Sequence, residues 1–178
     1  IKNYCKDGSW FWNRLTLGPI FDQNGNCTHF LGIQEDITQQ RIHEEYIKHQ
    51  HTHDHLTGLP NQHAFKQILE QVFAQRHDSA QPLILLYIDL DDFKNINDSL
   101  GHLVGDQILK SVGERLQGFA QENNVLCRFA EDEFILLMSG EYAQSEVEAI
   151  AEKMLELLSQ LFIVDEYKIH LSASIGIV

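Results

Sequence analysis

The stretch that decides the fold is residues 83–94, Leu-Ile-Leu-Leu-Tyr-Ile-Asp-Leu-Asp-Asp-Phe-Lys. Its first six residues form an apolar run beside polar sequence, which predicts a short buried β-strand. The next six include Asp89, Asp91, Asp92 and Lys94, which predict a turn from a strand into a helix. Such a turn can offer carboxylates to a cation, and backbone N–H groups with one ammonium to a phosphate.

Apolar spacing on both sides of this stretch predicts the remaining elements. Helices are expected near 65–73, 104–116 and 147–161, and strands near 125–129, 133–138 and 167–177. Ser145 with Glu148 has the spacing of a capping box, which predicts the start of the last helix. After the first helix the order is β-α-β-β-α-β, so we expect an α+β fold of the ferredoxin-like type.

The predicted topology brings three acids together. Right-handed crossovers place strand 133–138 between the other two central strands and antiparallel to both. Asp89 is then expected beside Asp132 and Glu133. Clustered carboxylates repel one another and commonly need a cation, and oxygen ligands favour Mg²⁺ or Ca²⁺. The residues alone leave a second interpretation open, in which these acids form only a polar surface loop.

The first 38 residues have the pattern of a β-hairpin. Strand-like runs at 10–17 and 28–34 flank a turn cluster at 22–26. Two or three strands do not form a stable domain alone, so we expect the rest of this sheet to precede Ile1. A polar, histidine-rich stretch at 39–53 follows and predicts a connecting helix, which could form a two-helix seam in a homodimer.

Composition excludes several classes of partner. The chain has 178 residues and a formal net charge of −13, which argues against nucleic acid and anionic membranes as partners. No apolar run is long enough to span a bilayer. Three cysteines in no paired motif indicate a reducing, cytoplasmic location. The sequence begins with Ile1 rather than Met, so we expect a piece of a longer protein.

Four motifs, in order, resemble the GGDEF domain of the diguanylate cyclase family. They are Asp-His-Leu-Thr-Gly-Leu-Pro-Asn at 54–61, the segment 88–98 with Gly-His at 101–102 and Gly-Asp at 105–106, Arg-Phe-Ala-Glu-Asp-Glu-Phe at 128–134, and Ser-Ala-Ser-Ile-Gly at 172–176. The resemblance implies a nucleotidyl-cyclase palm over residues 54–178, truncated at its C-terminus, with 39–53 as a signalling helix. It also implies cyclic di-GMP signalling, with GTP as ligand and Mg²⁺ as cofactor.

The resemblance assigns roles to residues that match the family's motif positions. It implies that Mg²⁺ is held by Asp89, the Leu90 carbonyl and Asp132. It implies Glu133 as the catalytic acid/base or as a second metal ligand. For phosphate binding it implies Asp92, Phe93 and Lys94, and for guanine binding Asn97 and Asp106. An amide plus a carboxylate can match the acceptor and donor edge of guanine.

Several residues depart from the family pattern, and these departures argue against full diguanylate cyclase activity. Ala130 and Glu131 stand where the signature has two glycines, which permit positive φ and close approach of backbone to a nucleotide. Glu131 also adds a negative charge, and two like charges about 4 Å apart cost about 4 kcal/mol at an effective dielectric of about 20. Gln62 replaces the usual arginine. Gln121 and Asn124 replace the charged residues of the product-inhibition RxxD motif, which argues against feedback by cyclic di-GMP.

Residues 1–38 resemble the end of a PAS domain, through Lys-Asp-Gly at 6–8 and Asp-Ile-Thr at 36–38. Within this segment, Asn3, Asn13 and Gln34 resemble the flavin-contacting amides of LOV photosensors. That resemblance implies FMN in the complete sensor domain. Another kind of PAS sensor and a plain β-hairpin remain open.

Three functions remain open at this stage. The favoured one is a degenerate GGDEF domain that binds GTP and Mg²⁺, makes little or no cyclic di-GMP and regulates a larger sensor protein. An EAL phosphodiesterase domain is expected downstream. The alternatives are an active diguanylate cyclase and a nucleotide-free dimerisation or relay module, so the sequence leaves open whether these residues form an enzyme.

Overall fold

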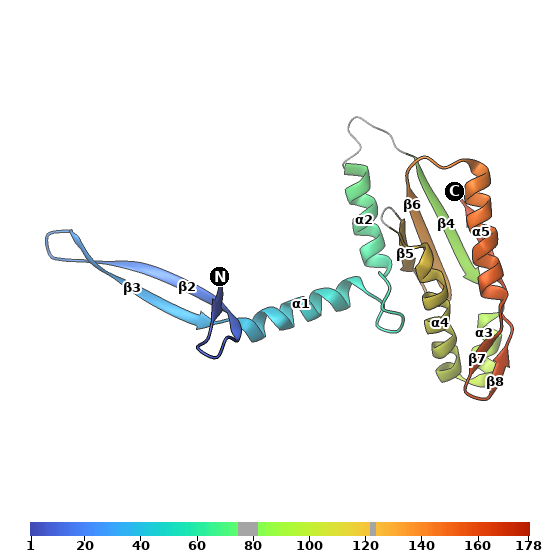
Figure 1. The fold of residues 1–178 in the computed structure, drawn as a ribbon, viewed down its shortest axis with the longest axis horizontal. Helices are drawn as coiled ribbons and strands as arrows, with labels where there is room; N and C mark the ends of the chain where they lie inside the picture. The colour runs from blue at the N-terminus through green and yellow to red at the C-terminus, as the bar shows by residue number, and fades with distance from the viewer. Residues whose placement is uncertain (75–81, 122–123) are drawn as a thin grey trace. The chain divides into compact units, whose positions relative to one another are not determined.

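The computed structural model describes residues 1–74, 82–121 and 124–178. It contains two compact units, Ile1–His49 and Gln50–Val178 (Figure 1). No helix in the described residues is both long enough and apolar enough to cross a membrane.

The first unit is a three-stranded antiparallel sheet that leads into a helix. Its elements are β1 (Lys2–Tyr4), β2 (Trp10–Phe21), β3 (Cys27–Asp36) and α1 (Thr38–Thr52). The β2–β3 turn forms because the Asp22 carboxylate accepts hydrogen bonds from the N–H groups of Asn24 and Asn26, at 2.8 and 2.9 Å. The predicted hairpin and the predicted connecting helix are therefore both present.

The second unit is built on a four-stranded antiparallel sheet. Its elements are α2 (Gln62–Ala74), β4 (Leu83–Leu90), α3 (Phe93–Leu100), α4 (His102–Leu116), the 3₁₀ turn η1 (Gln117–Phe119), β5 (Asn124–Arg128), β6 (Glu133–Ser139), α5 (Gln144–Ser159), β7 (Phe162–Val164), β8 (Tyr167–Ile169) and β9 (Ala173–Ile177). The strand order is β5-β6-β4-β9. This is the ferredoxin-like order, so the predicted fold class is confirmed, with β6 between β4 and β5.

Helices pack on both faces of this sheet (Figure 1). Side chains alternate between the two faces along each strand. On one face Leu86 and Ile88 are completely buried in the main core with residues of α4 and α5. On the other face Phe65 of α2 packs against Cys127 and Ile135. Burial on both faces specifies the register of β4 against β6, because a one-residue slip would turn every side chain to the wrong face.

The strand predicted over 167–177 is wrong in one respect, because it is two strands. β8 pairs with β7, whereas β9 pairs with β4. Ile169 and Leu171 are both buried, so the alternation of apolar residues continues although β8 ends at Ile169 and β9 begins only at Ala173. Apolar periodicity indicates which side chains are buried, but it does not indicate which strand is the pairing partner.

Two helix predictions also need correction. The N–H of Ala143 donates to the Glu146 carboxylate at 2.7 Å, so the predicted pair of Ser145 and Glu148 does not begin α5. Only half of a capping box forms, because alanine has no side-chain acceptor. A separate helix, α3, precedes α4 where one helical stripe was predicted. The two helices are separated by Gly101, whose φ of 87° favours glycine.

Candidate functional site

Carboxylates meet where β4 ends and β6 begins. Asp89 lies opposite Glu133 in the β4–β6 register, which puts the two side chains on the same face of the sheet. The Leu90 N–H donates to the carbonyl of Asp132 at 3.3 Å. The fold therefore brings the three predicted acids to one end of the sheet.

The negative charges at this end act on one another. Partial burial of Asp132, followed by the charges of Asp89, Glu133 and Glu131, raises the pKa of the Asp132 carboxyl above its ordinary value. The ion pairs found in the described ranges involve other acids. No lysine, arginine or histidine within those ranges forms a salt bridge that would relieve this repulsion.

Glu133 has a partner that the sequence did not point to. A hydrogen bond to Glu133, together with partial burial and the neighbouring acids, raises the pKa of Tyr87 to about 12. Tyr87 precedes Asp89 by two residues, so both side chains lie on the same face of β4. That spacing was the only signal in the sequence.

The donor set fits Mg²⁺ together with phosphate, and does not form a complete cage by itself. Within residues 1–74, 82–121 and 124–178, no three Asp, Glu, His or Cys side chains are grouped so that they could hold a metal ion. Asp89, Asp132 and the Leu90 carbonyl supply two carboxylates and one carbonyl. Mg²⁺ is commonly held by one or two carboxylates while phosphate oxygens and water complete its shell.

The segment expected to bind phosphate follows β4 directly and begins α3. Asp92 has a left-handed φ of 56°, and its carbonyl accepts the Asn95 N–H at 2.9 Å. Phe93 is buried and anchors the helix start, whereas Lys94 is exposed. The first N–H groups of a helix lack intrahelical acceptors and attract anions. This end of α3 therefore has the polarity that a phosphate requires.

The two residues expected to read guanine come from successive helices. Asn97 lies on α3, and Asp106 lies exposed on α4. The Asn97 Oδ1 atom is buried without a hydrogen-bond partner in the described residues. It lies against Gly105, where an added Cβ would overlap it. An amide and a carboxylate at such neighbouring positions can together match the guanine edge.

Arg128 ties the β5–β6 turn to the loop before α2. Its guanidinium donates to the Asp54 carboxylate at 2.9 Å and to the Glu131 carbonyl at 2.7 Å. Ala130 and Glu131 are exposed in this turn. Neither of these two residues has a positive φ. Among the described non-glycine residues, positive φ values occur at other positions of the chain. The turn thus lacks the left-handed conformation that glycines would permit, and the effect of their loss on nucleotide binding stays a prediction.

A family model described as "Diguanylate cyclase, GGDEF domain" matches residues 51–178. The chain belongs to the GGDEF domain family. A second model, described as a PAS domain, matches residues 1–39, ahead of the GGDEF match. The N-terminal sheet is thus a short PAS-type segment.

Relatives of this GGDEF chain carry names with opposite activities. Diguanylate cyclase DgcM of Escherichia coli strain K12 is 40% identical over 132 residues, covering 74% of this chain and 32% of its own. Cyclic di-GMP phosphodiesterase PdeR of the same strain is 35% identical over 142 residues, covering 80% and 21%. The chain spans about a fifth of the length of the first curated relatives that it matches.

A solved structure supports the same family. The crystal structure of a sensory box/GGDEF family protein from Caulobacter crescentus CB15 superposes with a TM-score of 0.65 at 33% identity. The match covers 71% of this chain and 82% of that chain.

The three residues expected to depart from the GGDEF pattern border one cavity. Gln62, Ala130 and Glu131 line a space of about 450 Å³, together with Asp54 and Arg128. The position that usually holds arginine and the two that usually hold glycine are therefore neighbours in space. Substitutions at these three positions would therefore alter the lining of the same cavity.

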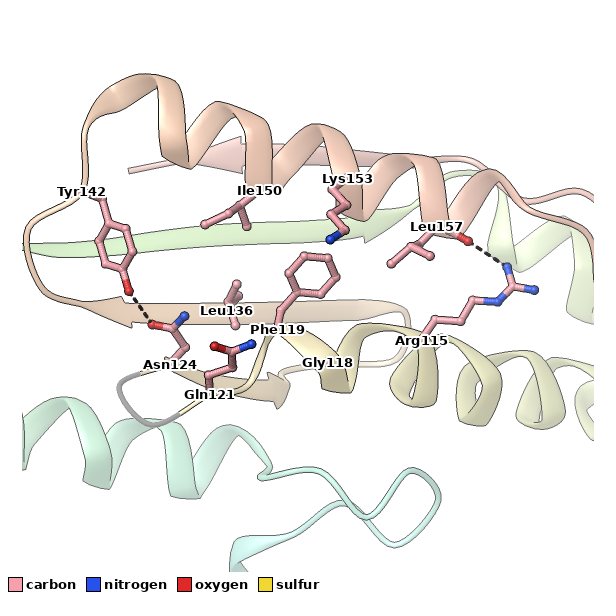
Figure 2. Close-up of a pocket in the computed structure, with 10 residues that line it drawn as sticks. All are labelled: Arg115, Gly118, Phe119, Gln121, Asn124, Leu136, Tyr142, Ile150, Lys153 and Leu157. Atoms are coloured by element: carbon pink, nitrogen blue, oxygen red, sulfur yellow. Dashed lines mark hydrogen bonds between the residues drawn. The ribbon is translucent and has the colours of Figure 1, made fainter.

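A second cavity, of about 440 Å³, contains the two positions compared with the RxxD motif (Figure 2). Gln121 and Asn124 line it beside apolar side chains of β6 and α5. The Tyr142 hydroxyl donates to Asn124 Oδ1 at 3.2 Å, and Lys153 contributes an amine. The arginine and aspartate of the motif are both missing, so the absence of cyclic di-GMP feedback stays a prediction.

The three amides expected to contact a flavin share one face of the PAS-type sheet. Asn3 lies opposite Phe11, and Gln34 lies opposite Leu15, while Asn13 lies between these two positions on β2. Asn13 is buried, and its Oδ1 has no hydrogen-bond partner in the described residues. The structure therefore brings the three together, and a bound flavin stays a prediction.

Proposed function

We propose that the GGDEF unit binds GTP with Mg²⁺ in the cytoplasm, forms little or no cyclic di-GMP, and regulates a larger sensor protein that carries an EAL domain. The observation that carries this proposal is the group of acids around Asp132. Partial burial, and then repulsion from the neighbouring acids, raises the pKa of Asp132, and the salt bridges of the described residues do not involve these acids. Mg²⁺ bound with the nucleotide would supply the missing positive charge.

The chain's own residues would divide the work of holding GTP. Asp89, Asp132 and the Leu90 carbonyl would hold the cation. The start of α3, at Asp92, Phe93 and Lys94, would receive the phosphates through backbone N–H groups and one ammonium. Asn97 and Asp106 would select guanine, because an adenine edge offers the opposite pattern of donors and acceptors.

Glu131 is the residue that we expect to suppress cyclase activity. A carboxylate about 4 Å from a phosphate charge costs about 4 kcal/mol at an effective dielectric of about 20. Glu131 is exposed, so solvent screening and side-chain rotation reduce this value. A loss of about ten- to a hundredfold in turnover is therefore expected, since about 1.4 kcal/mol corresponds to a factor of ten.

The alternative is an active cyclase, in which Glu133 would act as the catalytic acid/base. The 40% identity to diguanylate cyclase DgcM favours this alternative. The third alternative, a nucleotide-free dimerisation or relay module, would leave the acid group without a cation.

Calorimetric titration of Mg²⁺ and GTP, with a cyclic di-GMP assay, separates these functions. The proposal expects GTP binding with little product. If GTP gives no binding heat, only the relay module remains. Turnover at the rate of an active cyclase would overturn the proposal in favour of the active enzyme.

The hairpin explanation has its own test. The double change Ala130→Gly and Glu131→Gly should raise turnover by about tenfold or more, from the charge argument above. Glu141→Gly, which removes an exposed acid beyond the far end of β6, is the matched control and should change nothing. A double variant that binds GTP and stays as inactive as the parent would reject Glu131 as the cause.

A further inference from the structure

Asp91 lies between the residues expected to bind metal and those expected to bind phosphate, and it has been given neither role. Its carboxylate accepts hydrogen bonds from two hydroxyls, from Ser172 to Oδ2 at 2.7 Å and from Ser174 to Oδ1 at 2.8 Å. Its backbone N–H donates to the Ser172 carbonyl at 3.0 Å. Three hydrogen bonds thus join the residue after β4 to the start of β9.

Both carboxylate oxygens are already engaged by β9. Hydrogen bonds from hydroxyls to a carboxylate are charge-assisted and are stronger than those between neutral groups. The partners are 81 and 83 residues away in sequence. Asp91 therefore connects two strands that are neighbours in the sheet but distant in sequence. Its acidity and its place at the edge of the site would by themselves suggest a metal ligand.

The backbone bond of Asp91 orients the carbonyl of Leu90. The Leu90 C=O and the Asp91 N–H belong to one planar trans peptide, so they point in opposite directions. Because the Asp91 N–H is directed at Ser172, the direction of the Leu90 carbonyl is fixed. The buried Leu90 side chain, 1% exposed, holds the same peptide from the other side.

Asp91 also supports the conformation that follows it. Asp92 has a φ of 56°, a left-handed conformation that aspartate tolerates better than most residues but that still persists best when its surroundings hold it. The Asp91 bonds to Ser172 and Ser174 fix the residue immediately before this turn. The direction in which α3 leaves the sheet, and so the direction of its first N–H groups, depends on that support.

We propose that Asp91 is a positioning residue of the nucleotide site. Together with Ser172 and Ser174 it aims the Leu90 carbonyl and the first turn of α3, and it binds neither metal nor phosphate itself. This inference rests on the proposed function, because it says how the same site is held in shape.

The test compares variants that remove the hydroxyls with variants that keep them. Ser172→Ala with Ser174→Ala removes both donors, whereas Ser172→Thr with Ser174→Thr retains them. Ser159→Ala is the matched control, because its hydroxyl donates at 2.8 Å to the Glu156 carbonyl at the distant end of α5. Hydrogen exchange of amides 92–95 in ligand-free protein is measured first, and calorimetry with GTP and Mg²⁺ second.

The double alanine variant should exchange amides 92–95 about tenfold faster and bind GTP about five- to tenfold more weakly, as expected for losing bonds to a charged acceptor near the surface. The threonine and Ser159→Ala variants should behave as the parent protein. Asp91→Asn should show the same pattern as the double alanine variant in both measurements.

Three results would overturn the inference or separate it from the proposed function. Loss of GTP binding in Asp91→Asn, with a normal double alanine variant, would make Asp91 a direct ligand. Faster exchange spread evenly over β9, with unchanged GTP affinity, would make the bonds merely structural. If the parent binds no GTP, the proposed function fails, and unchanged exchange at 92–95 in the double alanine variant would then refute the positioning role separately.

Discussion

Replacement of Gly105 by alanine should weaken GTP binding by displacing Asn97. A Cβ at Gly105 would overlap Asn97 Oδ1, and would lie 2.9 Å from Asn97 Cγ and 3.2 Å from Phe93 Cζ. Gly105 is in the first turn of α4 and has no positive φ, so the helix backbone accepts alanine. Alanine is in fact the better helix former, by about 1 kcal/mol. The perturbation therefore acts on the Asn97 side chain and spares the helix.

The size of the effect follows from what Asn97 would do. Its amide must rotate away from the guanine edge, which leaves at least one polar group of the bound base unpaired. An unsatisfied buried donor or acceptor costs about 1–3 kcal/mol, so GTP affinity should fall about ten- to a hundredfold. The preference for GTP over ATP should fall with it, because Asp106 alone would remain to discriminate.

Calorimetry with GTP and with ATP measures both effects, and thermal denaturation reports stability. Gly113→Ala is the control, because a Cβ there, on the same helix, would lie 3.3 Å from Leu59 Cδ1 and 3.5 Å from Thr57 Cβ. It should leave binding unchanged. Parental GTP affinity and preference in Gly105→Ala, or an equal loss in Gly113→Ala, would refute the reasoning.

Further predictions concern charge and stability. The raised pKa of Asp132 means that the folded state binds this proton more tightly, so stability falls as the pH rises from about 3.8 through the raised value. Asp132→Asn should therefore raise the melting temperature of the ligand-free protein at neutral pH and weaken Mg²⁺-dependent GTP binding. A melting temperature that does not rise would contradict this. For Asp54, burial acts to raise the pKa, but hydrogen bonds from Arg128 and Thr57 outweigh it and lower the pKa below 3.8. That contribution to stability is present above about pH 4 and is lost as the pH falls through the lowered pKa, so urea denaturation of Asp54→Asn should show a flatter acid limb. The Arg115 guanidinium donates to three backbone carbonyls at the end of α5, at 2.7 to 3.0 Å. Arg115→Met should lower the free energy of unfolding by about 2 kcal/mol, and a change below about 0.5 kcal/mol in denaturant titration would show that these bonds contribute little.

Local patterns in the sequence were sufficient for most of the elements and for bringing the acids to one end of the sheet. The apolar run at 83–88 predicted β4, and the β-α-β-β-α-β order with its handedness rule placed Asp89 beside Glu133. The resemblance to the GGDEF family pointed to Asn97 and Asp106, which lie on the two helices that follow β4, and their role in guanine binding stays a prediction. These inferences succeed because periodicity and chain order are properties of neighbouring residues.

The sequence by itself determined most of the buried positions, the order of the elements and the family motifs, since each depends on residues close together in the chain. The tertiary structure decided the partners that the order of elements does not specify. It broke the last strand between Ile169 and Ala173, paired Tyr87 with Glu133, and engaged Asp91 with serines more than eighty residues away. The physical reason is that a hydrogen-bond partner is set by sheet register and crossover geometry, which no single stretch of sequence encodes.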